Sequence, residues 1–258
     1  MNDITVRRPI KWLSCGETNV GTVRKINEDS ILSKPEERLW VVADGMGGYE
    51  AGDIASSMTV NSIDATQYNE SLEDTVLSIE NNLLAVNQKI LDYSYEMCNQ
   101  NTIGTTVVSL VIRDRVGACI WAGDSRLYRY RNGQLQQVSR DHSHVEELIE
   151  QGLLSKEEAE NHPDSNVITR AIGANEYIEI DVIKFDTQVG DTFLLCSDGL
   201  YNAVSLDDIV TCLNGDNIEK IVQQLLSIAL DNKASDNVSI IVARGESEKL
   251  ARNRVSAL

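Results

Sequence analysis

The stretch WVVADGMGGYEAGDIAS, residues 40–56, indicates how the chain is built, because a strand pattern is followed in it by a helix pattern. The run RLWVVAD at 38–44 is apolar and β-branched, which is typical of a strand, and residues 50–64 have the apolar spacing of a helix. Between them, Asp44 is followed by Gly45-Met46-Gly47-Gly48. An acidic residue therefore lies where a buried strand ends and the chain turns.

Strand patterns of the same kind recur along the chain. They cover residues 105–112, 117–124, 126–133, 191–198 and 237–244. Asn132-Gly133 is a hairpin-turn signal, so we expect antiparallel strands at 126–131 and 134–138.

Helix patterns are interleaved with these strands. They cover residues 50–64, 71–96, 143–151, 155–161, 205–213 and 216–232. The second of them begins after Ser71, a candidate cap, with Asp74 three residues later. Antiparallel strands with helices in pairs favour the α+β class over a regular βαβ alternation. Without an internal repeat or a linker, residues 1–258 are expected to form a single domain, with a polar tail over about 244–258.

The charge of the chain excludes some classes of partner. Its 23 Lys and Arg against 40 Asp and Glu give 23 − 40 = −17, which repels nucleic-acid phosphates and anionic membrane surfaces. No apolar run reaches the ~18 residues of a membrane span, and the first residues lack the apolar stretch of a secretory signal. We expect a cytoplasmic protein that binds neither nucleic acid nor membrane.

Cysteine and histidine argue against a zinc or thioredoxin-like site. The five cysteines are widely separated and form no CxxC pair, and Cys119 and Cys196 lie in apolar runs, as reduced core residues do. Three histidines, at 142, 144 and 162, are too few and too clustered for a histidine-rich metal centre. If a metal is bound, oxygen atoms must hold it.

Four aspartates lie next to strand patterns: Asp44, Asp124, Asp198 and Asp236. An unpaired carboxylate beside a core is costly, and one hard divalent cation offsets several of them at once. Oxygen ligands suit Mg²⁺ or Mn²⁺, and a pair of such ions catalyses displacement at phosphorus. Taken alone, each aspartate is explained as a turn residue or a helix cap. That explanation weakens because the same placement recurs at four separate positions.

The segment VRKINEDS, residues 23–30, contains a candidate phosphate ligand. The guanidinium of Arg24 is suited to grip phosphate, although a solvated arginine in a loop is the alternative. Glu28 and Asp29 are candidates to hold metal-bound waters, or else form a solvent-facing pair.

Eight ordered segments carry a family resemblance: VRKINEDS, WVVADGMGGYEAGDIAS, IGTTVVSLVI, WAGDSRLYRYRNG, SRDHSHVEELIEQGLLSKEEAENHP, VITRAIG, LLCSDGLYNAV and ASDNVSIIVAR. In this order they resemble the bacterial branch of the metal-dependent type 2C (PPM) serine/threonine protein phosphatases. The resemblance extends from about Gly16 to Arg244. It implies a four-layer α-β-β-α sandwich, in which two antiparallel sheets are flanked by helix pairs. Residues 141–170 match the flap beside the catalytic cleft.

The resemblance also implies the ligands of two Mn²⁺ or Mg²⁺ ions. Asp44 would bridge the ions, with the Gly45 carbonyl, Asp198 and Asp236 as further protein ligands. Asp124, with Asp198, resembles the support of a third, weaker metal. Arg24 resembles the arginine that grips phosphate. The residues implied to support these groups are Glu28, Asp29 and Asn237.

The reaction implied is hydrolysis of phosphoserine and phosphothreonine in proteins by a hydroxide that bridges the metals, without a phosphoenzyme. Met46 stands where eukaryotic relatives commonly carry a histidine that protonates the leaving group. Metal-bound water is then the preferred proton donor. His142 or His144 is the alternative donor, and both are otherwise residues of the flap structure.

Other phosphatase chemistries lack their sequence patterns. No cysteine has an arginine six positions later, no Asp-x-Asp occurs, and neither a G-x-S-x-G elbow nor a P-loop is present. One alternative is a catalytically weak pseudophosphatase that binds phosphoproteins. A stress-response regulatory phosphatase is another. The expected partners are phosphorylated proteins, the targets of a serine/threonine kinase or parts of a secretion apparatus, and a monomer is expected.

Overall fold

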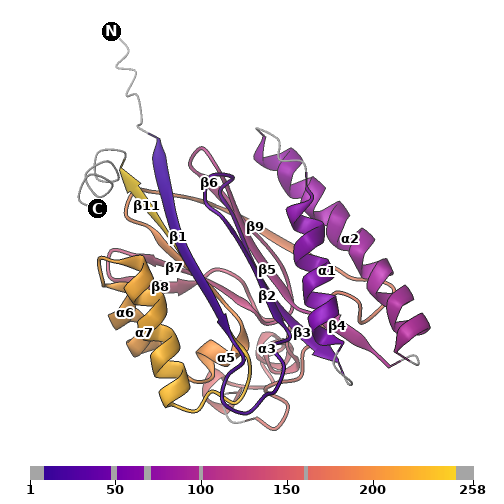
Figure 1. Cartoon of the computed structure of the whole chain (residues 1–258). Coiled ribbons are helices and arrows are strands. Elements are labelled where there is room, and N and C mark those ends of the chain that lie inside the picture. Colours follow the sequence, from indigo (N-terminus) through magenta and orange to yellow (C-terminus); the bar gives the residue numbers. More distant parts are fainter. Residues whose placement is uncertain (1–8, 48–50, 67–70, 99–100, 160–161, 248–258) are drawn as a thin grey trace.

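The computed structural model describes residues 9–47, 51–66, 71–98, 101–159 and 162–247 (Figure 1). The strands within them are β1 (Ile10–Asn19), β2 (Asp29–Lys34), β3 (Leu39–Gly47), β4 (Ile103–Thr105), β5 (Val107–Arg113), β6 (Val116–Ala122), β7 (Arg126–Arg131), β8 (Gln134–Gln137), β9 (Asp181–Asp186), β10 (Thr192–Cys196) and β11 (Val238–Ser247). The helices are α1 (Gly52–Asp64), α2 (Leu72–Met97), α3 (His144–Glu150), α4 (Lys156–Ala159), α5 (Asp198–Tyr201), α6 (Leu206–Leu213) and α7 (Ile218–Asp231).

The strands form two antiparallel sheets. One has the order β1-β11-β10-β7-β8, and the other the order β2-β3-β5-β6-β9, with β4 paired to β3. Every strand pairing of the described residues is antiparallel. The predicted α+β class with two antiparallel sheets is confirmed.

Three apolar clusters separate four layers. Leu39, Val41 and Ala43 of β3 pack with α1 and α2, whereas Trp40 and Val42 face the other sheet, as the two-residue period of a strand requires. Between the sheets, the Trp12 ring lies 6.0 Å from that of Trp40. On the far side, the second sheet packs against α6 and α7. Figure 1 shows α1 with α2 and α6 with α7 on opposite flanks of the sheets.

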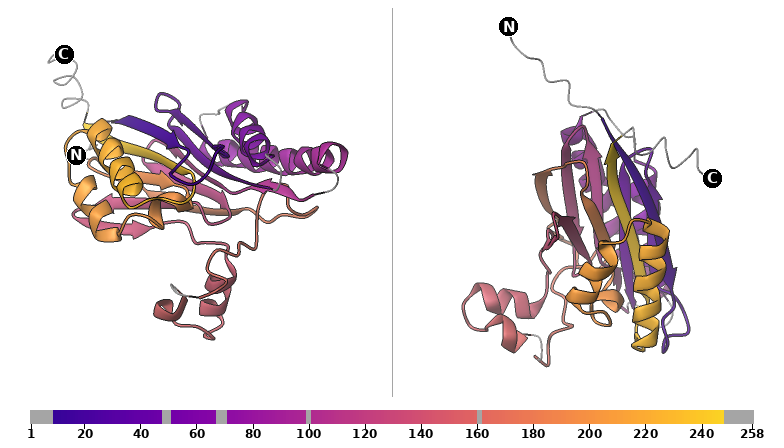
Figure 2. Two further views of the ribbon diagram at one scale, coloured as in Figure 1. Left: turned by 60° about the horizontal axis from the view of Figure 1, so that its bottom comes forward. Right: turned by 90° about the vertical axis from the view of Figure 1, so that its left-hand side faces the viewer.

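The segment 141–170 projects from this sandwich. Figure 2 shows α3 and α4, with the loops beside them, standing away from the sheets and the other helices. One isolated bridge, Ser143 to Ile168, closes the base of the segment, and a second, Thr105 to Ile172, ties the chain just beyond it to β4. The segment expected as a flap is therefore a distinct projection of the chain.

Most predicted elements are confirmed with small shifts at their ends. The hairpin at 126–131 and 134–137 has Asn132 at φ 52° and Gly133 at φ 81°, as its turn signal requires. Ser71 caps α2, its hydroxyl accepting from the Asp74 N–H at 3.3 Å. The predicted helix starts and ends at residues 50, 160 and 161 lie outside the described residues.

Four strands were not predicted as such. β1, β2 and β9 each lie at an edge of their sheet, and the three-residue β4 pairs with β3 outside the main strand order. An edge strand buries fewer side chains than a central one, so its apolar pattern is weaker. In β9 no side chain is fully buried, and β1 buries only Ile10 and Trp12 of its ten residues.

The predicted polar tail over 244–258 is wrong at its start. Residues 244–247 continue β11 and pair with β1, from Leu13 opposite Arg244 to Ile10 opposite Ser247. Arg244 donates to the carbonyls of Leu213 and Gly215 at 3.0 and 2.8 Å, so this polar residue holds the end of α6. Residues 248–258 lie outside the described residues.

The predicted strand 191–198 also ends early. β10 stops at Cys196, and Asp198 is the first residue of the short helix α5. Among the helices of the described residues, none combines the length and the apolar character that crossing a lipid bilayer requires.

Candidate active site

Strand direction brings the predicted acidic residues to one end of the sandwich. Asp44 lies near the end of β3, and Asp29 begins the neighbouring antiparallel strand β2 directly opposite it. Asp198 follows β10, and Asp236 precedes its antiparallel neighbour β11. Because the end of one strand meets the start of its antiparallel partner, both sheets present carboxylates at the same edge.

The carboxyl groups of Asp29 and Asp198 lie close enough to Asp44 to raise its pKa. Burial, then the charges of Asp29 and Asp198, raise the pKa of Asp44 well above its ordinary value. Burial, then the charge of Asp236, raise the pKa of Asp198 to about 6. Burial likewise raises the pKa of Asp29 to about 6, against hydrogen bonds that lower it. Such a cluster of carboxylates is unfavourable without a cation.

The donor chemistry of this cluster fits a divalent cation. Asp29 is 7% exposed, and its Oδ1, like the Oδ1 of Asp198, is buried without a hydrogen-bond partner. Carboxylate oxygens without protein donors are the ligands that Mg²⁺ and Mn²⁺ prefer. Among the described residues, however, no three His, Cys, Asp or Glu side chains are already arranged around one metal position. The residues converge, and binding an ion requires them to adjust.

One expected metal ligand, Asp236, forms an ion pair with an arginine. Arg24 Nη2 donates to Asp236 Oδ2 at 2.7 Å, and the side chains are 54% and 36% exposed. Arg24 therefore lies beside the acidic cluster, with more than half of its side chain open to solvent. The pair is accessible, so Arg24 is available to turn from Asp236 to another anion.

The backbone around Asp44 is held on both sides. The Asp44 N–H donates to Thr106 Oγ1 at 3.1 Å, and the Asp44 carbonyl accepts from the Thr106 N–H at 2.8 Å. A Cβ on Gly45 would lie 2.2 Å from the Gly52 carbonyl oxygen and 2.4 Å from that of Glu28. Three backbone segments thus meet at Gly45, and only glycine fits there.

Asn237 fastens the loop that carries Arg24 and Glu28. Its Oδ1 accepts from the Glu28 N–H at 2.8 Å, and its Nδ2 donates to the carbonyls of Val20 and Ile26 at 3.0 Å each. Asn237 is 4% exposed, so this tie is buried. It explains how the loop before β2 reaches the start of β11.

Glu28 and Asp29 do not form the solvent-facing pair considered as an alternative. Glu28 Oε1 accepts from the Gly52 N–H at 3.1 Å, and the Glu28 carbonyl accepts from Gly45 at 3.1 Å. Asp29 Oδ2 accepts from the Ser197 hydroxyl at 2.8 Å, next to Asp198. Both residues brace the segments that carry the expected ligands.

Asp124 lies beside the cluster and connects it to the base of the projecting segment. Burial, then the charges of Asp198 and Asp141, raise its pKa to about 7. The Tyr201 hydroxyl donates to Asp124 Oδ2 at 3.3 Å, and the Arg126 guanidinium lies 3.6 Å from the centre of the Tyr201 ring. Arg126 in turn donates to Asp141 at 2.6 Å.

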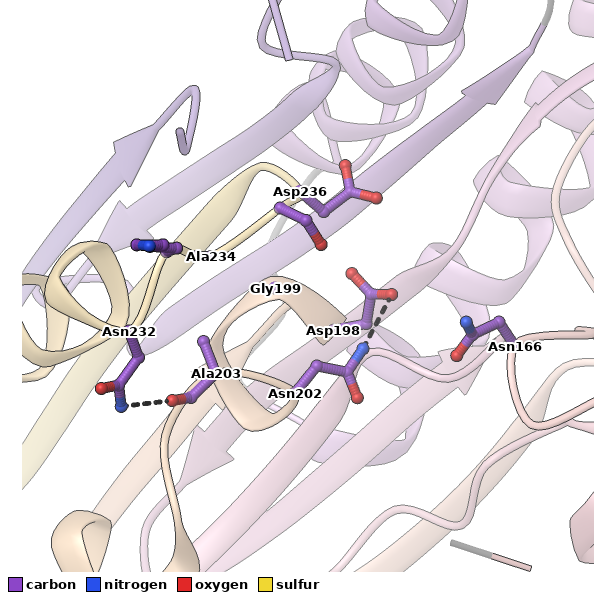
Figure 3. A pocket seen from close by; sticks show the side chains of 10 residues that line it. Asn166, Asp198, Gly199, Asn202, Ala203, Asn232, Ala234 and Asp236 are labelled. Carbon is purple, nitrogen blue, oxygen red and sulfur yellow. Dashed lines mark hydrogen bonds between the residues drawn. The ribbon is translucent and has the colours of Figure 1, made fainter. Parts of the chain in front are cut away.

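A cavity of about 310 Å³ opens beside Asp198 and Asp236. Figure 3 shows their carboxylates directed into one space, with Asn166 of the projecting segment on the other side of Asp198. Asn202 Nδ2 donates to Asp198 Oδ2 at 3.3 Å. A larger cavity of about 520 Å³ runs between the projecting segment and α5 and α6, and Asn166 and Asn202 line both cavities.

The two histidines at the start of the projecting segment, His142 and His144, have structural contacts. The Gly123 N–H donates to His142 Nδ1 at 3.1 Å, so Nε2 carries the proton of the neutral ring and faces Asp181 at 3.3 Å. The ring is 7% exposed and stacks on Trp121. The backbone N–H of His144 donates to the Val167 carbonyl at 2.9 Å. Met46, which stands where eukaryotic relatives commonly carry a histidine, pairs with Gly104 of β4.

Several residues of the site were not identified from the sequence. Thr106, Ser197, Tyr201 and Asn202 contact the acidic residues through hydrogen bonds. Ser197 and Asn202 were detectable in principle, because they lie one residue before and four after Asp198. Thr106 had no local signal, since its contact with Asp44 spans 62 positions.

With this geometry in view, the chain was compared with known proteins. The family model described as Protein phosphatase 2C matches residues 22–240. A serine/threonine phosphatase stp of Listeria monocytogenes serotype 4b is 33% identical over 244 residues, which cover 92% of this chain and 97% of the relative.

Solved structures are similar over almost the whole chain. PppA, described as a key regulatory component of T6SS in Pseudomonas aeruginosa, superimposes with a TM-score of 0.84 at 37% identity, covering 93% of this chain and 100% of its own. The catalytic domain of the serine threonine protein phosphatase PstP, in complex with two manganese ions, has a TM-score of 0.83 at 28% identity, with 92% and 100% covered.

Proposed function

The chain belongs to the protein phosphatase 2C family and is a metal-dependent protein serine/threonine phosphatase, and from this premise we propose how its residues divide the reaction. Asp44, Asp198 and Asp236, with the Gly45 carbonyl, hold two Mn²⁺ or Mg²⁺ ions. The single observation that carries this assignment is the convergence of buried carboxyl groups with raised pKa values at one edge of both sheets.

The two ions, when bound, supply a nucleophile from water at neutral pH and neutralise charge on the reacting phosphate. The protein's part is to hold the ligands rigidly. Thr106 fixes the backbone of Asp44, and the serine hydroxyl of residue 197 holds Asp29 beside Asp198. Glu28, Asp29 and Asn237 thereby support the ligands from behind. Asp124 is the proposed support of a third ion, beside Asp198.

Arg24 is the proposed phosphate ligand. Its ion pair with the half-exposed Asp236, at 2.7 Å, supports this role, because Asp236 is a proposed metal ligand. When Asp236 binds an ion, Arg24 loses that partner and turns to the substrate phosphate, which its planar fork matches. The Met46 position offers no titratable group, and His142 is occupied by Gly123 and Asp181, so the leaving group takes its proton from water.

Residues 141–170 are proposed as a flap subdomain of a single phosphatase domain. This proposal is supported by Asn166 of the segment, which lines the same cavity as Asp198. The substrates proposed are proteins phosphorylated by a serine/threonine kinase. The description of PppA as a key regulatory component of T6SS supports secretion-apparatus proteins as one such class. A cytoplasmic monomer is proposed, in keeping with five free cysteine thiols.

The pseudophosphatase alternative is not favoured, because each expected acidic ligand lies at the cluster and the relatives are phosphatases. Hydrolysis of a phosphothreonine peptide with Mn²⁺ tests the proposal. Asp198→Asn is expected to lower kcat/KM by more than about 100-fold, above the effect of residues that merely support ligands.

The matched control is Asp207→Asn, an identical change at an exposed position of α6. It should retain wild-type turnover and the wild-type response to Mn²⁺. Full activity of Asp198→Asn, or wild-type protein that neither binds Mn²⁺ by calorimetry nor hydrolyses the peptide, would refute the assignment.

A further inference from the structure

Lys233 occupies a backbone conformation that a lysine rarely adopts. It directly follows Asn232, the cap at the end of α7, and has φ 60°. The Lys233 N–H donates to the Leu230 carbonyl and the Ala234 N–H to the Ala229 carbonyl, both at 2.9 Å. This is the Schellman arrangement, in which glycine is the usual residue at the left-handed position.

The fold makes no evident use of the Lys233 side chain. The side chain is exposed, and no acidic side chain of the described residues forms an ion pair with it. The three other non-glycine residues with positive φ in the described chain lie in strand-to-strand turns: Arg38, Asp114 and Asn132. Lys233 is the one of the four that ends a helix.

Lys233 lines the cavity beside the acidic cluster. It shares that cavity with Asp198 and Asp236, and it is the single cationic residue among those that line it. The other polar residues of the lining are Ser235 and three asparagines, Asn166, Asn202 and Asn232. A cationic residue thus lines the space next to the position proposed for the reacting phosphate.

The turn that carries Lys233 is held at both sides. Asn232 Nδ2 donates to the Ala203 carbonyl at 2.8 Å, as Figure 3 shows. The Ala234 carbonyl accepts from both the backbone N–H and the hydroxyl of Thr22, at 2.9 Å each. The base of the lysine is therefore fixed relative to Asp236, two residues beyond Ala234.

We propose that Lys233 is a specificity-determining residue that binds an anionic group flanking the phosphorylated residue of the substrate. This inference rests on the proposed function. In the proposed function, Arg24 and the metal ions bind the reacting phosphate. Lys233, which lines the adjoining cavity, is therefore available to bind a second anionic group. A glutamate or aspartate carboxylate and a second phosphate share the required chemistry.

The test is a ratio of rates on matched peptides. A phosphothreonine peptide with glutamate on both flanks is compared with the same peptide carrying glutamine, and with one carrying non-hydrolysable phosphonates at those positions. Wild-type kcat/KM is expected to be about three- to fivefold higher for the glutamate peptide, the effect of a solvent-accessible ion pair. A larger gain with phosphonate than with glutamate would identify a second phosphate as the preferred anion.

Lys233→Gly suits the left-handed turn, so it removes the side chain without straining the backbone, and its Tm should not fall. We expect its glutamate-to-glutamine ratio to drop to about one. Lys233→Arg should keep the preference, and Lys233→Glu should invert it. The control is Lys220→Ala, which removes an exposed lysine in the first turn of α7 and should keep the wild-type ratio.

The outcomes separate this inference from the proposed function. Wild-type enzyme that hydrolyses both peptides equally overturns the role of Lys233 and leaves the phosphatase assignment standing. An equal loss on both peptides in Lys233→Gly also overturns it, because the lysine would then act on the reacting phosphate or through its general field. Wild-type enzyme that hydrolyses neither peptide overturns both.

Discussion

Asp198 has opposing effects on stability and on function. Its carboxylate is held near three other acidic side chains, those of Asp29, Asp44 and Asp236, and its Oδ1 has no hydrogen-bond partner. This arrangement destabilises the metal-free fold and creates the affinity for a cation. A site of this kind is expected to stabilise the protein only when its ion is bound.

The pH dependence of stability should report this conflict. Asp29 and Asp198 have pKa values of about 6 in the fold, against about 3.9 in an unfolded chain. Because the folded pKa values are raised, protonation favours the fold, and this contribution is lost as the pH rises through 6. Without metal, we expect the Tm to fall between pH 5 and pH 8, and excess Mn²⁺ to raise it most at pH 8.

Calorimetry in EDTA and in Mn²⁺ measures both effects. Asp198→Asn is the control, since it removes one of the titrating groups and should flatten the metal-free pH profile. Equal slopes for the wild type and Asp198→Asn would contradict the expectation.

Gly45 shows a steric requirement at the same scale. In Gly45→Ala the added methyl would overlap the backbone oxygens of Gly52 and Glu28, at 2.2 and 2.4 Å. We expect a loss of about 3 kcal/mol or more of unfolding free energy in urea. Gly152→Ala, at φ 69° with nothing within 4 Å of the new Cβ, should lose only about 1 kcal/mol from backbone strain. Similar losses in the two variants would argue against the overlap.

At the scale of the elements, the ion pair of Arg126 with Asp141 is one of the contacts that join the proposed flap to the sandwich. Arg126 on β7 donates to both carboxylate oxygens of Asp141, at the base of the flap, and packs over the Tyr201 ring of α5. The two side chains are 23% and 13% exposed. The pair therefore links β7, α5 and the flap in one contact.

Removing one member should leave the other charge buried. Asp141→Ala is expected to cost about 3 kcal/mol in urea unfolding, because Arg126 loses its partner. Arg140→Ala is the matched control, since its pair with Glu146 is exposed and worth less than about 1 kcal/mol. Arg126→Met combined with Asp141→Leu should recover part of the loss. An Asp141→Ala effect no larger than that of Arg140→Ala would place the flap attachment elsewhere.

For the whole molecule, the layer between the sheets carries a large share of the stability. Trp40 is fully buried there, in edge contact with Trp12. Trp40→Ala is expected to cost about 4 kcal/mol of unfolding free energy, the usual effect of emptying a buried aromatic site. Tyr177→Ala, at a residue that is 91% exposed, should change it by less than about 0.5 kcal/mol. A small effect of Trp40→Ala would mean that the sheets pack through other contacts.

Local patterns were sufficient for most of the fold. The central strands and the helices bury one face, or both faces, and their apolar spacing is strong, as in β3 and α7. The edge strands β1, β2 and β9 escaped detection because half of each is open to solvent or polar. The polar end of β11 looked like a tail for the same reason, although β1 pairs with it.

The candidate site also has a part that local sequence patterns predict and a part that they do not. Asp44, Asp198 and Asp236 were identified from the sequence, because each acidic residue directly adjoins an apolar strand pattern or a glycine turn. Their distances, the pairing of Arg24 with Asp236, and the role of Asn237 arise between segments up to 217 positions apart. No local pattern encodes such contacts.

The sequence by itself determined which residues are buried, which turn, and which carry charge next to the core, since burial and turn chemistry are properties of short segments. Only the tertiary structure decided that the carboxylates share one edge, that the flap is tied to β7, and that Lys233 faces their cavity. The physical reason is that electrostatic and steric coupling depends on distance in space, which antiparallel pairing of distant strands sets.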